Sequence, residues 1–229
     1  MKNIEVISLD AYGTLLNPEV GMKLALNKYI HIDKKGTYDD LWGCFFKEIN
    51  LFFKKIEQEK CTPFICAKGI YEYIYNQNTY FQSLGLNADE FVQMICFAHS
   101  NASLYEGILE LVSSLRRKYR LVILTSDADN DFLNKAINQT HLKFDHIITS
   151  EEAKGYKAEI NSKLFLRLIE VSGTAPRKIL HIGDSIYDTK RSRELGLSAL
   201  LIDHDSHKTL TDDENSPVGM KGLGKLLLS

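Results

Sequence analysis

The sequence predicts an α/β protein in which a doubly wound parallel sheet carries an inserted all-helical subdomain. Apolar runs that resemble strands alternate with helical segments in the second half of the chain, which is typical of a parallel sheet with helices on both faces. One further apolar run, residues 4–9, opens the chain, and only helical periodicity follows it for many residues. We therefore expect residues 1–16 and 101–229 to form the sheet domain and residues 17–100 to form the insertion.

The composition is that of an ordinary globular protein. The 229 residues are 44% apolar and 25% charged, which is enough apolar material for a substantial core. A net charge of -2 gives no general attraction to nucleic acid or to an anionic membrane surface. No apolar run approaches the roughly 20 residues that span a bilayer, and the start lacks the apolar region of a signal peptide. We expect a cytoplasmic protein with neither nucleic acid nor a membrane as a partner, and its oligomeric state stays open.

Helical stripes account for the insertion. Residues 18–30 begin with a proline suited to a first helical turn, and residues 41–56 carry a long apolar stripe. Further helices are expected over residues 63–75 and 88–98, and no convincing strand lies between them. Of the 1 Trp, 11 Tyr and 11 Phe residues in the chain, 15 fall in residues 17–100. Most of these rings are expected to fill the core of the insertion, and a few to line an apolar roof over a substrate.

All four cysteines lie in the insertion, at Cys44, Cys61, Cys66 and Cys96. They do not form the close CxxC pairs of a zinc site, and four are too few for a secreted disulfide scaffold. We interpret them as reduced residues that pack in the interior.

The second half of the chain supplies the rest of the sheet. Strands are expected over residues 121–124, 147–149, 179–182 and 199–202. Helices are expected over residues 106–118, 130–138 and 162–171 and before Gly196. The tail from His204 is interpreted as a loop followed by a short packing segment at residues 226–228.

Three of the predicted strands end in side chains that can take part in chemistry. They end at Asp10, Thr125 and Asp184. Ligands of doubly wound sheets bind at the carboxyl ends of the strands, so these side chains indicate a site. Asp188 follows Asp184 by about one helical turn, so both carboxylates can face one ion. Three carboxylates with no adjacent His or Cys indicate a hard cation, and we predict Mg²⁺.

Other residues near these strand ends suit the binding of phosphate. Thr125 supplies a hydroxyl, and Lys157 supplies a positive charge for phosphate oxygens. Residues 127–131 resemble the start of a calcium-binding loop but lack its glycine and glutamate, so we interpret them as a helix cap. Ser126 and Asp127 are expected to contact the substrate. His181 lies inside an apolar strand and is interpreted as a core histidine.

These residues together resemble the haloacid dehalogenase superfamily, whose members share four short motifs in this order. Residues 10–15, Asp-Ala-Tyr-Gly-Thr-Leu, are similar to the nucleophile loop of that family. Thr125 resembles its hydroxyl motif, Lys157 its lysine motif and residues 183–188 its acidic motif. The resemblance implies a Rossmann-like core, with residues 17–100 as a mobile helical cap over the active site.

The resemblance also implies a mechanism. Asp10 would attack phosphorus and form an aspartyl-phosphate, which water would then hydrolyse. Mg²⁺ would be held by Asp10, the Tyr12 carbonyl and Asp184, with Asp188 bound directly or through water. Thr125 and Lys157 would hold the transferring group, and Thr14 would brace the nucleophile loop.

Two departures from the family pattern bear on the activity. Phosphatases of this family usually have an Asp two residues after the nucleophile as general acid. This chain has Tyr12 there, and a phenol with a pKa of about 10 donates a proton poorly. Asp-x-Tyr-Gly-Thr is instead the pattern of the true 2-haloacid dehalogenases. The lysine motif usually continues with proline, but Ala158 follows Lys157, so Lys154 is an alternative for that position.

Other features count against dehalogenation. The dehalogenases work without metal and receive the halide on a cap arginine, whereas both Asp184 and Asp188 are present and the first arginine here is Arg116. We therefore predict a Mg²⁺-dependent phosphohydrolase for a small organic phosphate monoester with an apolar or uncharged body. The alternatives are a metal-independent 2-haloacid dehalogenase and a degenerate member that binds a phosphorylated ligand with little turnover.

Overall fold

The fold is built on a parallel sheet whose strands lie in the order β5-β4-β1-β6-β7. The computed structural model describes residues 3–30, 37–59, 63–204 and 219–228. The five strands of this sheet are β1 (Val6–Asp10), β4 (Leu121–Ser126), β5 (His146–Thr149), β6 (Ile179–Gly183) and β7 (Ser198–Leu201). All the pairings between them are parallel. This sheet confirms the predicted doubly wound α/β fold.

Apolar residues on both faces of the sheet hold the helices in place. Val6 belongs to a cluster with Phe165 of α9 (Lys163–Ser172), whereas Ile7 and Leu9 belong to a second, larger cluster. Successive side chains of a strand point to opposite faces, so the two clusters lie on opposite sides of β1. A strand covered on both faces is buried along its whole length, as β1 is.

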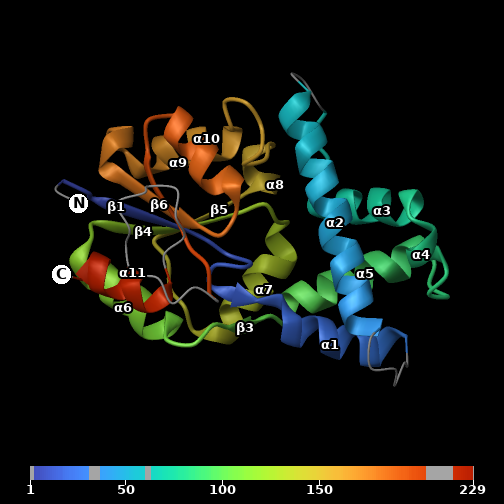
Figure 1. The fold of residues 1–229 in the computed structure, drawn as a ribbon. Helices are drawn as coiled ribbons and strands as arrows, with labels where there is room; N and C mark the ends of the chain where they lie inside the picture. The colour runs from blue at the N-terminus through green and yellow to red at the C-terminus, as the bar shows by residue number, and fades with distance from the viewer. Residues whose placement is uncertain (1–2, 31–36, 60–62, 205–218, 229) are drawn as a thin grey trace.

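Figure 1 shows α9 and α10 on one side of the sheet and α6 and α11 on the other. Besides α9, the described helices around the sheet are α6 (Ile108–Lys118), α7 (Asn130–Thr140), α8 (Ser150–Ala153), the short 3₁₀ helix η1 (Pro176–Lys178), α10 (Ile186–Glu194) and α11 (Met220–Leu228). The α8 helix was not predicted, because a single turn leaves no periodic pattern in the sequence. Among the described helices, none is both long and apolar enough to cross a membrane.

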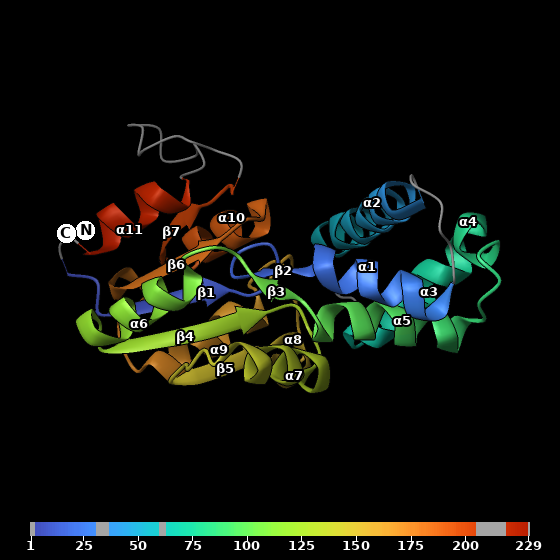
Figure 2. The same cartoon turned by 90° about the horizontal axis from the view of Figure 1, so that it is seen from below.

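A group of helices lies beyond the carboxyl ends of the strands (Figure 2). This helical group consists of α1 (Pro18–Tyr29), α2 (Thr37–Gln58), α3 (Ala67–Gln77), α4 (Thr79–Gln82) and α5 (Ala88–Ser100). The α5 helix packs on both α1 and α3, which makes it the centre of the group. The α3 helix begins at Ala67 rather than at the predicted residue 63.

Two very short strands join the helical group to the sheet. They are β2 (Leu16–Asn17) and β3 (Ser103–Leu104), which pair in the antiparallel sense. The sequence did not predict this pairing, because two residues are too few to show a strand pattern. As a result, the chain enters and leaves the helical group along adjacent paths (Figure 2).

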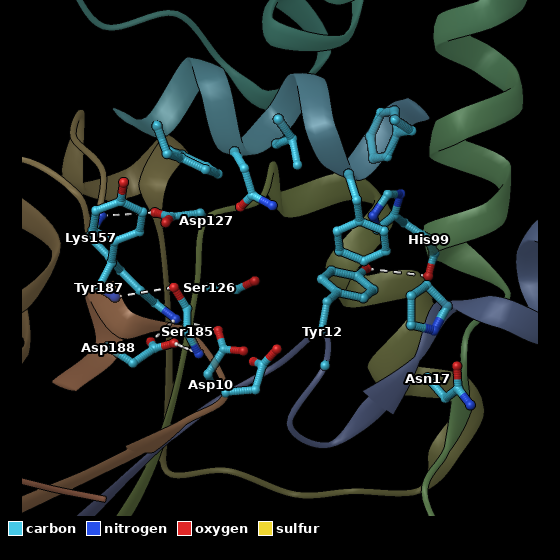
Figure 3. A pocket seen from close by; sticks show the side chains of 18 of the residues that line it. Asp10, Tyr12, Asn17, His99, Ser126, Asp127, Lys157, Ser185, Tyr187 and Asp188 are labelled. Carbon is cyan, nitrogen blue, oxygen red and sulfur yellow. Dashed lines mark hydrogen bonds and ion pairs between the residues drawn. The ribbon is translucent and has the colours of Figure 1, made fainter. Parts of the chain in front are cut away.

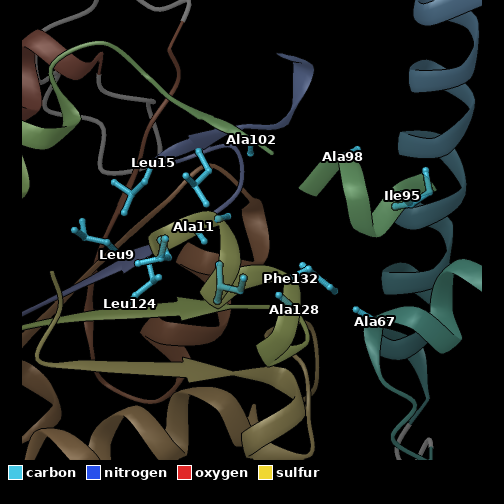
Figure 4. Packing of buried hydrophobic residues seen from close by; sticks show 14 of the residues in the cluster. Leu9, Ala11, Leu15, Ala67, Ile95, Ala98, Ala102, Leu124, Ala128 and Phe132 are labelled. Carbon is cyan, nitrogen blue, oxygen red and sulfur yellow. The ribbon is translucent and has the colours of Figure 1, made fainter. Parts of the chain in front are cut away.

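Polar contacts dock the helical group onto the sheet. The Asp129 carboxylate accepts the backbone N–H groups of Ala67 and Lys68 at 2.7 and 3.1 Å, so a residue of the sheet part caps α3. We had expected this loop to cap its own helix, but Asp129 makes no side-chain cap on α7. The Asp129 carboxylate instead accepts N–H groups in the first turn of α3 that have no partner within that helix, and this favours a helix start at Ala67. Phe132 of α7 adds an apolar contact on the side facing Ala67 (Figure 4).

Replacing Asp129 with asparagine is expected to lower the free energy of unfolding by about 1–2 kcal/mol, because hydrogen bonds to a charged acceptor at a helix N-terminus are lost or weakened. Chemical denaturation in urea measures this change. Asp131→Asn is the matched control, since it removes an exposed ion pair with Lys68, keeps an oxygen for the Phe132 N–H and should cost less than about 1 kcal/mol. Equal losses in the two variants would contradict a docking role for Asp129.

The cysteines that the structure describes are free thiols. Cys44, Cys66 and Cys96 are all half-buried, and Cys61 lies outside the described residues. Burial raises the pKa of Cys96 to about 12, so its thiol is protonated and unreactive at neutral pH. These three residues agree with the interpretation of reduced packing cysteines.

Candidate active site

The carboxyl edge of the sheet brings the predicted residues together. Asp10 is the last residue of β1, and Thr125 of β4 lies beside it in register. Asp184 directly follows β6, the neighbour of β1 on its other side. The three strand ends therefore meet at one edge, as expected for parallel strands. Figure 3 shows the cavity that opens above this edge.

Asp10, Asp184 and Asp188 form a cluster of carboxylates. Each offers one oxygen atom, and these oxygens all lie within 4.8 Å of one another. Asp188 stands in the first turn of α10, where its Oδ2 accepts the backbone N–H of Ser185 at 3.0 Å. This capping box turns the Asp188 carboxylate toward the strand edge.

Close packing of the backbone lets these carboxylates approach. Gly13 has a φ of +87°, and a Cβ atom there would lie 2.2 Å from Oδ2 of Asp184. A Cβ atom on Gly183 would lie 2.2 Å from the Asp188 carboxyl carbon. The loop after β1 and the end of β6 thus need glycine at these two positions.

Lys157 is the positive charge inside the cluster. Its buried ammonium contacts Oδ1 of Asp10 and lies 2.7 Å from Oδ1 of Asp188. Lys154, the alternative for the lysine motif, is exposed, and its ammonium lies 5.5 Å from the centre of the Phe64 ring. The structure therefore brings Lys157 to the carboxylates and leaves Lys154 outside.

The cluster carries more negative than positive charge. Burial raises the pKa of Asp10 well above its usual range; Lys157 opposes this rise, and the other two carboxylates add to it. Burial would also raise the pKa of Asp188, but Lys157 and His181 hold it well below its usual range. Three carboxylates thus share one ammonium, and this surplus of oxygen donors and negative charge fits a hard divalent cation such as Mg²⁺.

Tyr12 is held by the helical group. Its hydroxyl donates to the backbone carbonyl of His99 on α5 at 3.3 Å, and the two rings meet edge to face at 4.7 Å. Figure 3 shows the Tyr12 ring directed toward His99 and away from Asp10. Burial raises the pKa of Tyr12 well above 10. A phenol in this position is a poor proton donor at neutral pH.

The hydroxyl residues occupy different layers of the site. Thr14 Oγ1 lies 3.2 Å from Oδ2 of Asp10 and 3.1 Å from Oδ1 of Asp184, so it braces two carboxylates. The fully buried Thr125 hydroxyl donates to the Leu9 carbonyl at 3.4 Å and does not line the cavity. Ser126 does line it, as the next residue along β4. Substrate contact was expected of both Thr125 and Ser126, and only Ser126 faces the cavity.

Sequence reasoning missed the part that His181 plays. This histidine is buried, as expected of a core residue, but its Nε2 lies 2.9 Å from Oδ1 of Asp188 and its Nδ1 lies 3.0 Å from the Ser8 hydroxyl. It therefore anchors one carboxylate of the cluster to β1. The position of His181 two residues before the end of an apolar strand was the only signal in the sequence.

The cavity above the cluster has a volume of about 1230 Å³ and a largely aromatic wall. The helical group contributes most of the rings that line it, namely Tyr38, Trp42, Phe45, Phe46, Phe53 and Tyr71. His204 also lines the cavity, stacked on Tyr105 with ring centres 3.4 Å apart. It stands at the start of the predicted loop, and its Nε2 lies 2.9 Å from the Thr14 carbonyl. The roof predicted for some of the aromatic residues is thus present.

The chain is similar to known hydrolases. Residues 4–196 match the family model described as haloacid dehalogenase-like hydrolase. A search of curated proteins gives no match. The comparison with solved structures gives the L-2-haloacid dehalogenase RSc1362, with a TM-score of 0.80, 14% identity and 100% of both chains covered.

Two further solved structures show different chemical states. One is an L-2-haloacid dehalogenase from Xanthobacter autotrophicus with chloropropionic acid covalently bound, with a TM-score of 0.75, 15% identity and 98% of this chain and 97% of that chain covered. The other is the HAD-hydrolase YfnB from Bacillus subtilis bound to magnesium, with a TM-score of 0.75, 18% identity and 99% of both chains covered. At such identities the likeness shows a shared fold alone.

Proposed function

The chain belongs to the haloacid dehalogenase-like hydrolases, and from this membership we propose that it is a Mg²⁺-dependent phosphohydrolase acting on a small organic phosphate monoester. The observation that carries the proposal is the cluster of Asp10, Asp184 and Asp188, whose carboxylate oxygens lie within 4.8 Å of one another. A phosphate dianion would be repelled by three carboxylates that share one ammonium. Mg²⁺ held by these carboxylates, with the Tyr12 carbonyl as a further oxygen donor, would offset that repulsion and polarise the phosphate.

In the proposed reaction the chain supplies the nucleophile and its supports. Asp10 attacks phosphorus and forms an aspartyl-phosphate, which water then hydrolyses. Lys157 orients the Asp10 carboxylate and provides positive charge for the oxygens of the transferring group. Thr14 keeps Asp10 and Asp184 in register through its shared hydroxyl. The Thr125 hydroxyl binds the Leu9 carbonyl and so holds β4 against β1 beneath the site. The Ser126 hydroxyl is the one available to the substrate.

We propose that residues 17–100 serve as a cap and that this cap selects the body of the substrate. The aromatic wall contributed by Trp42, Phe45 and Tyr71 suits an apolar or uncharged body. No arginine is found among the described residues that line the cavity, so the wall offers no guanidinium to a second phosphate group. A small monoester with an apolar body is therefore the favoured substrate class.

A second candidate is a metal-independent 2-haloacid dehalogenase. Tyr12 favours it, because residues 10–14, Asp-Ala-Tyr-Gly-Thr, resemble the Asp-x-Tyr-Gly-Thr pattern of those enzymes. The resemblance also requires an arginine in the cap to receive the halide, and the first arginine of the chain is Arg116 in α6. The acidic cluster and the absence of arginine from residues 17–100 support our proposal of phosphate chemistry over dehalogenation.

Two assays separate the candidates. We expect the protein to release phosphate from para-nitrophenyl phosphate with Mg²⁺, to lose this activity with a chelator and to release no chloride from 2-chloropropionate. Chloride release that persists in chelator would overturn the proposal in favour of the dehalogenase. The absence of both activities, together with binding of inorganic phosphate, would indicate a degenerate member that binds phosphate.

A further inference from the structure

A phosphohydrolase that acts on alkyl esters needs a proton donor, and the residue two places after the nucleophile does not provide one here. An alkoxide is a poor leaving group, so protonation of the leaving oxygen contributes about 10²- to 10⁴-fold to the rate. Tyr12 is engaged with the His99 carbonyl. The His99 ring is no substitute, because its Nδ1 donates to the Ile95 carbonyl at 2.9 Å and burial lowers its pKa to about 4.

We infer that Asp127 is the general acid, which protonates the leaving oxygen while Asp10 attacks phosphorus. This inference rests on the proposed function and assigns a catalytic role in that same site. Asp127 directly follows β4, and Thr125, two residues earlier on that strand, lies in register with Asp10. Both Asp10 and Asp127 line the cavity.

The contacts of Asp127 leave one of its oxygens available. Oδ1 accepts the backbone N–H of Lys157 at 3.1 Å, and Oδ2 has no hydrogen-bond partner in the described part of the chain. The side chain of Lys157 runs from this N–H to the Asp10 carboxylate, so one lysine side chain spans the two acids. In Figure 3 Asp127 is drawn between Asp10 and α2, whose residues also line the cavity. A substrate bound at Asp10 would extend its body into this cavity. In-line attack by Asp10 directs the leaving oxygen to that side.

The surroundings of Asp127 favour its acid form. Burial raises the pKa of Asp127 to about 7; the Lys157 charge and N–H oppose this rise, and the carboxylates of Asp188 and Glu159 add to it. The Tyr156 phenol is close enough for Asp127 to raise its pKa in turn, and it stays neutral at neutral pH. A carboxyl group poised near pH 7 can both give and take a proton.

The proton and electron pairs balance over two steps. In the first step an oxygen of Asp10 bonds to phosphorus, the bond from phosphorus to the ester oxygen breaks, and Asp127 gives its proton to that oxygen to release the alcohol. In the second step Asp127 takes a proton from water as the water oxygen bonds to phosphorus. The bond between Asp10 and phosphorus breaks, so phosphate leaves and both carboxyl groups return to their starting states.

The test compares two esters in Asp127→Asn and in the wild-type protein. Asparagine keeps an oxygen for the Lys157 N–H but has no acidic proton. For an alkyl ester such as phenethyl phosphate, we expect phosphate release to fall about 10²- to 10⁴-fold. With para-nitrophenyl phosphate, whose leaving group needs no proton, the rapid first release of para-nitrophenol should stay within about threefold of wild type. It should be followed by slow turnover, because the second step has lost its base.

The pH profile gives a second measurement. Wild-type turnover of phenethyl phosphate should fall as the pH rises through about 7, because Asp127 loses its proton, and Asp127→Asn should lack this fall. Asp131→Asn is the matched control. It makes the same chemical change at an exposed carboxylate four residues along the chain that does not line the cavity, so it should keep the burst and both turnover rates within about threefold.

Failure of Asp127 as the general acid can be told apart from failure of the proposed phosphohydrolase function. If wild type hydrolyses both esters with Mg²⁺ and Asp127→Asn slows the alkyl ester and the para-nitrophenol burst equally, or slows neither, then Asp127 is not the acid and only the inference fails. If wild type hydrolyses neither ester, the proposed function fails and the inference fails with it. Selective loss with the alkyl ester supports both.

Discussion

Replacing Asp10 with asparagine is expected to abolish turnover, with a loss in kcat of about 10⁴-fold or more, because an amide oxygen cannot serve as the nucleophile. The change keeps the shape of the side chain and an oxygen that can accept from Thr14 or Lys157. Steady-state phosphate release measures the loss. Acid quenching after incubation with radiolabelled substrate should trap phosphoenzyme in wild type and none in the variant.

A stability measurement tests whether Asp10→Asn loses turnover because the variant is unfolded. Asparagine removes one of three crowded carboxylates, so we expect the thermal midpoint in chelator to be at least as high as that of wild type. Asp89→Asn makes the same chemical change at an exposed position of α5 and should leave turnover within about twofold. Retention of more than about a tenth of wild-type kcat by Asp10→Asn would contradict a nucleophilic role.

The sequence was sufficient to predict the edge of the sheet at which the candidate site lies. Asp10, Thr125 and Asp184 each end an apolar run, and parallel strands necessarily bring such ends to one edge. Asp188 could be added because one helical turn separates it from Asp184. These inferences need only local periodicity and the rule that alternating strands and helices form a parallel sheet.

Contacts between distant segments could not be predicted in this way. Asp129 caps a helix 62 positions away in the chain, and nothing in its own neighbourhood indicates that partner. The direction of the Tyr12 ring depends on where the carbonyl of His99 lies once α5 has packed. The availability of Asp127 depends on the same packing, because Asp129 and not Asp127 supplies the cap. The division into core and cap stays a prediction of the sequence.

The second large effect is expected from Lys157→Met, which removes the charge but keeps an unbranched side chain. We expect kcat to fall about 10²- to 10³-fold, because positive charge at the transferring group is lost. The free energy of unfolding in chelator should fall by about 3–5 kcal/mol, since Asp10 and Asp188 lose a buried partner. Lys154→Met is the matched control at an exposed site, and it should change the free energy of unfolding by less than about 0.5 kcal/mol.

Lys157 has two proposed roles: it neutralises the carboxylates, and it donates to the phosphate. Titration with Mg²⁺ distinguishes these two roles. In wild type the ammonium and the cation share the carboxylates of Asp10 and Asp188, so they repel each other across the same oxygens. Without the ammonium, Mg²⁺ should raise the thermal midpoint at lower concentration than in wild type and recover much of the lost stability. Turnover should not recover, because the cation replaces the charge that stabilises the carboxylates but not the donor aimed at the phosphate. Recovery of both stability and turnover would show that Lys157 acts only as a counter-charge.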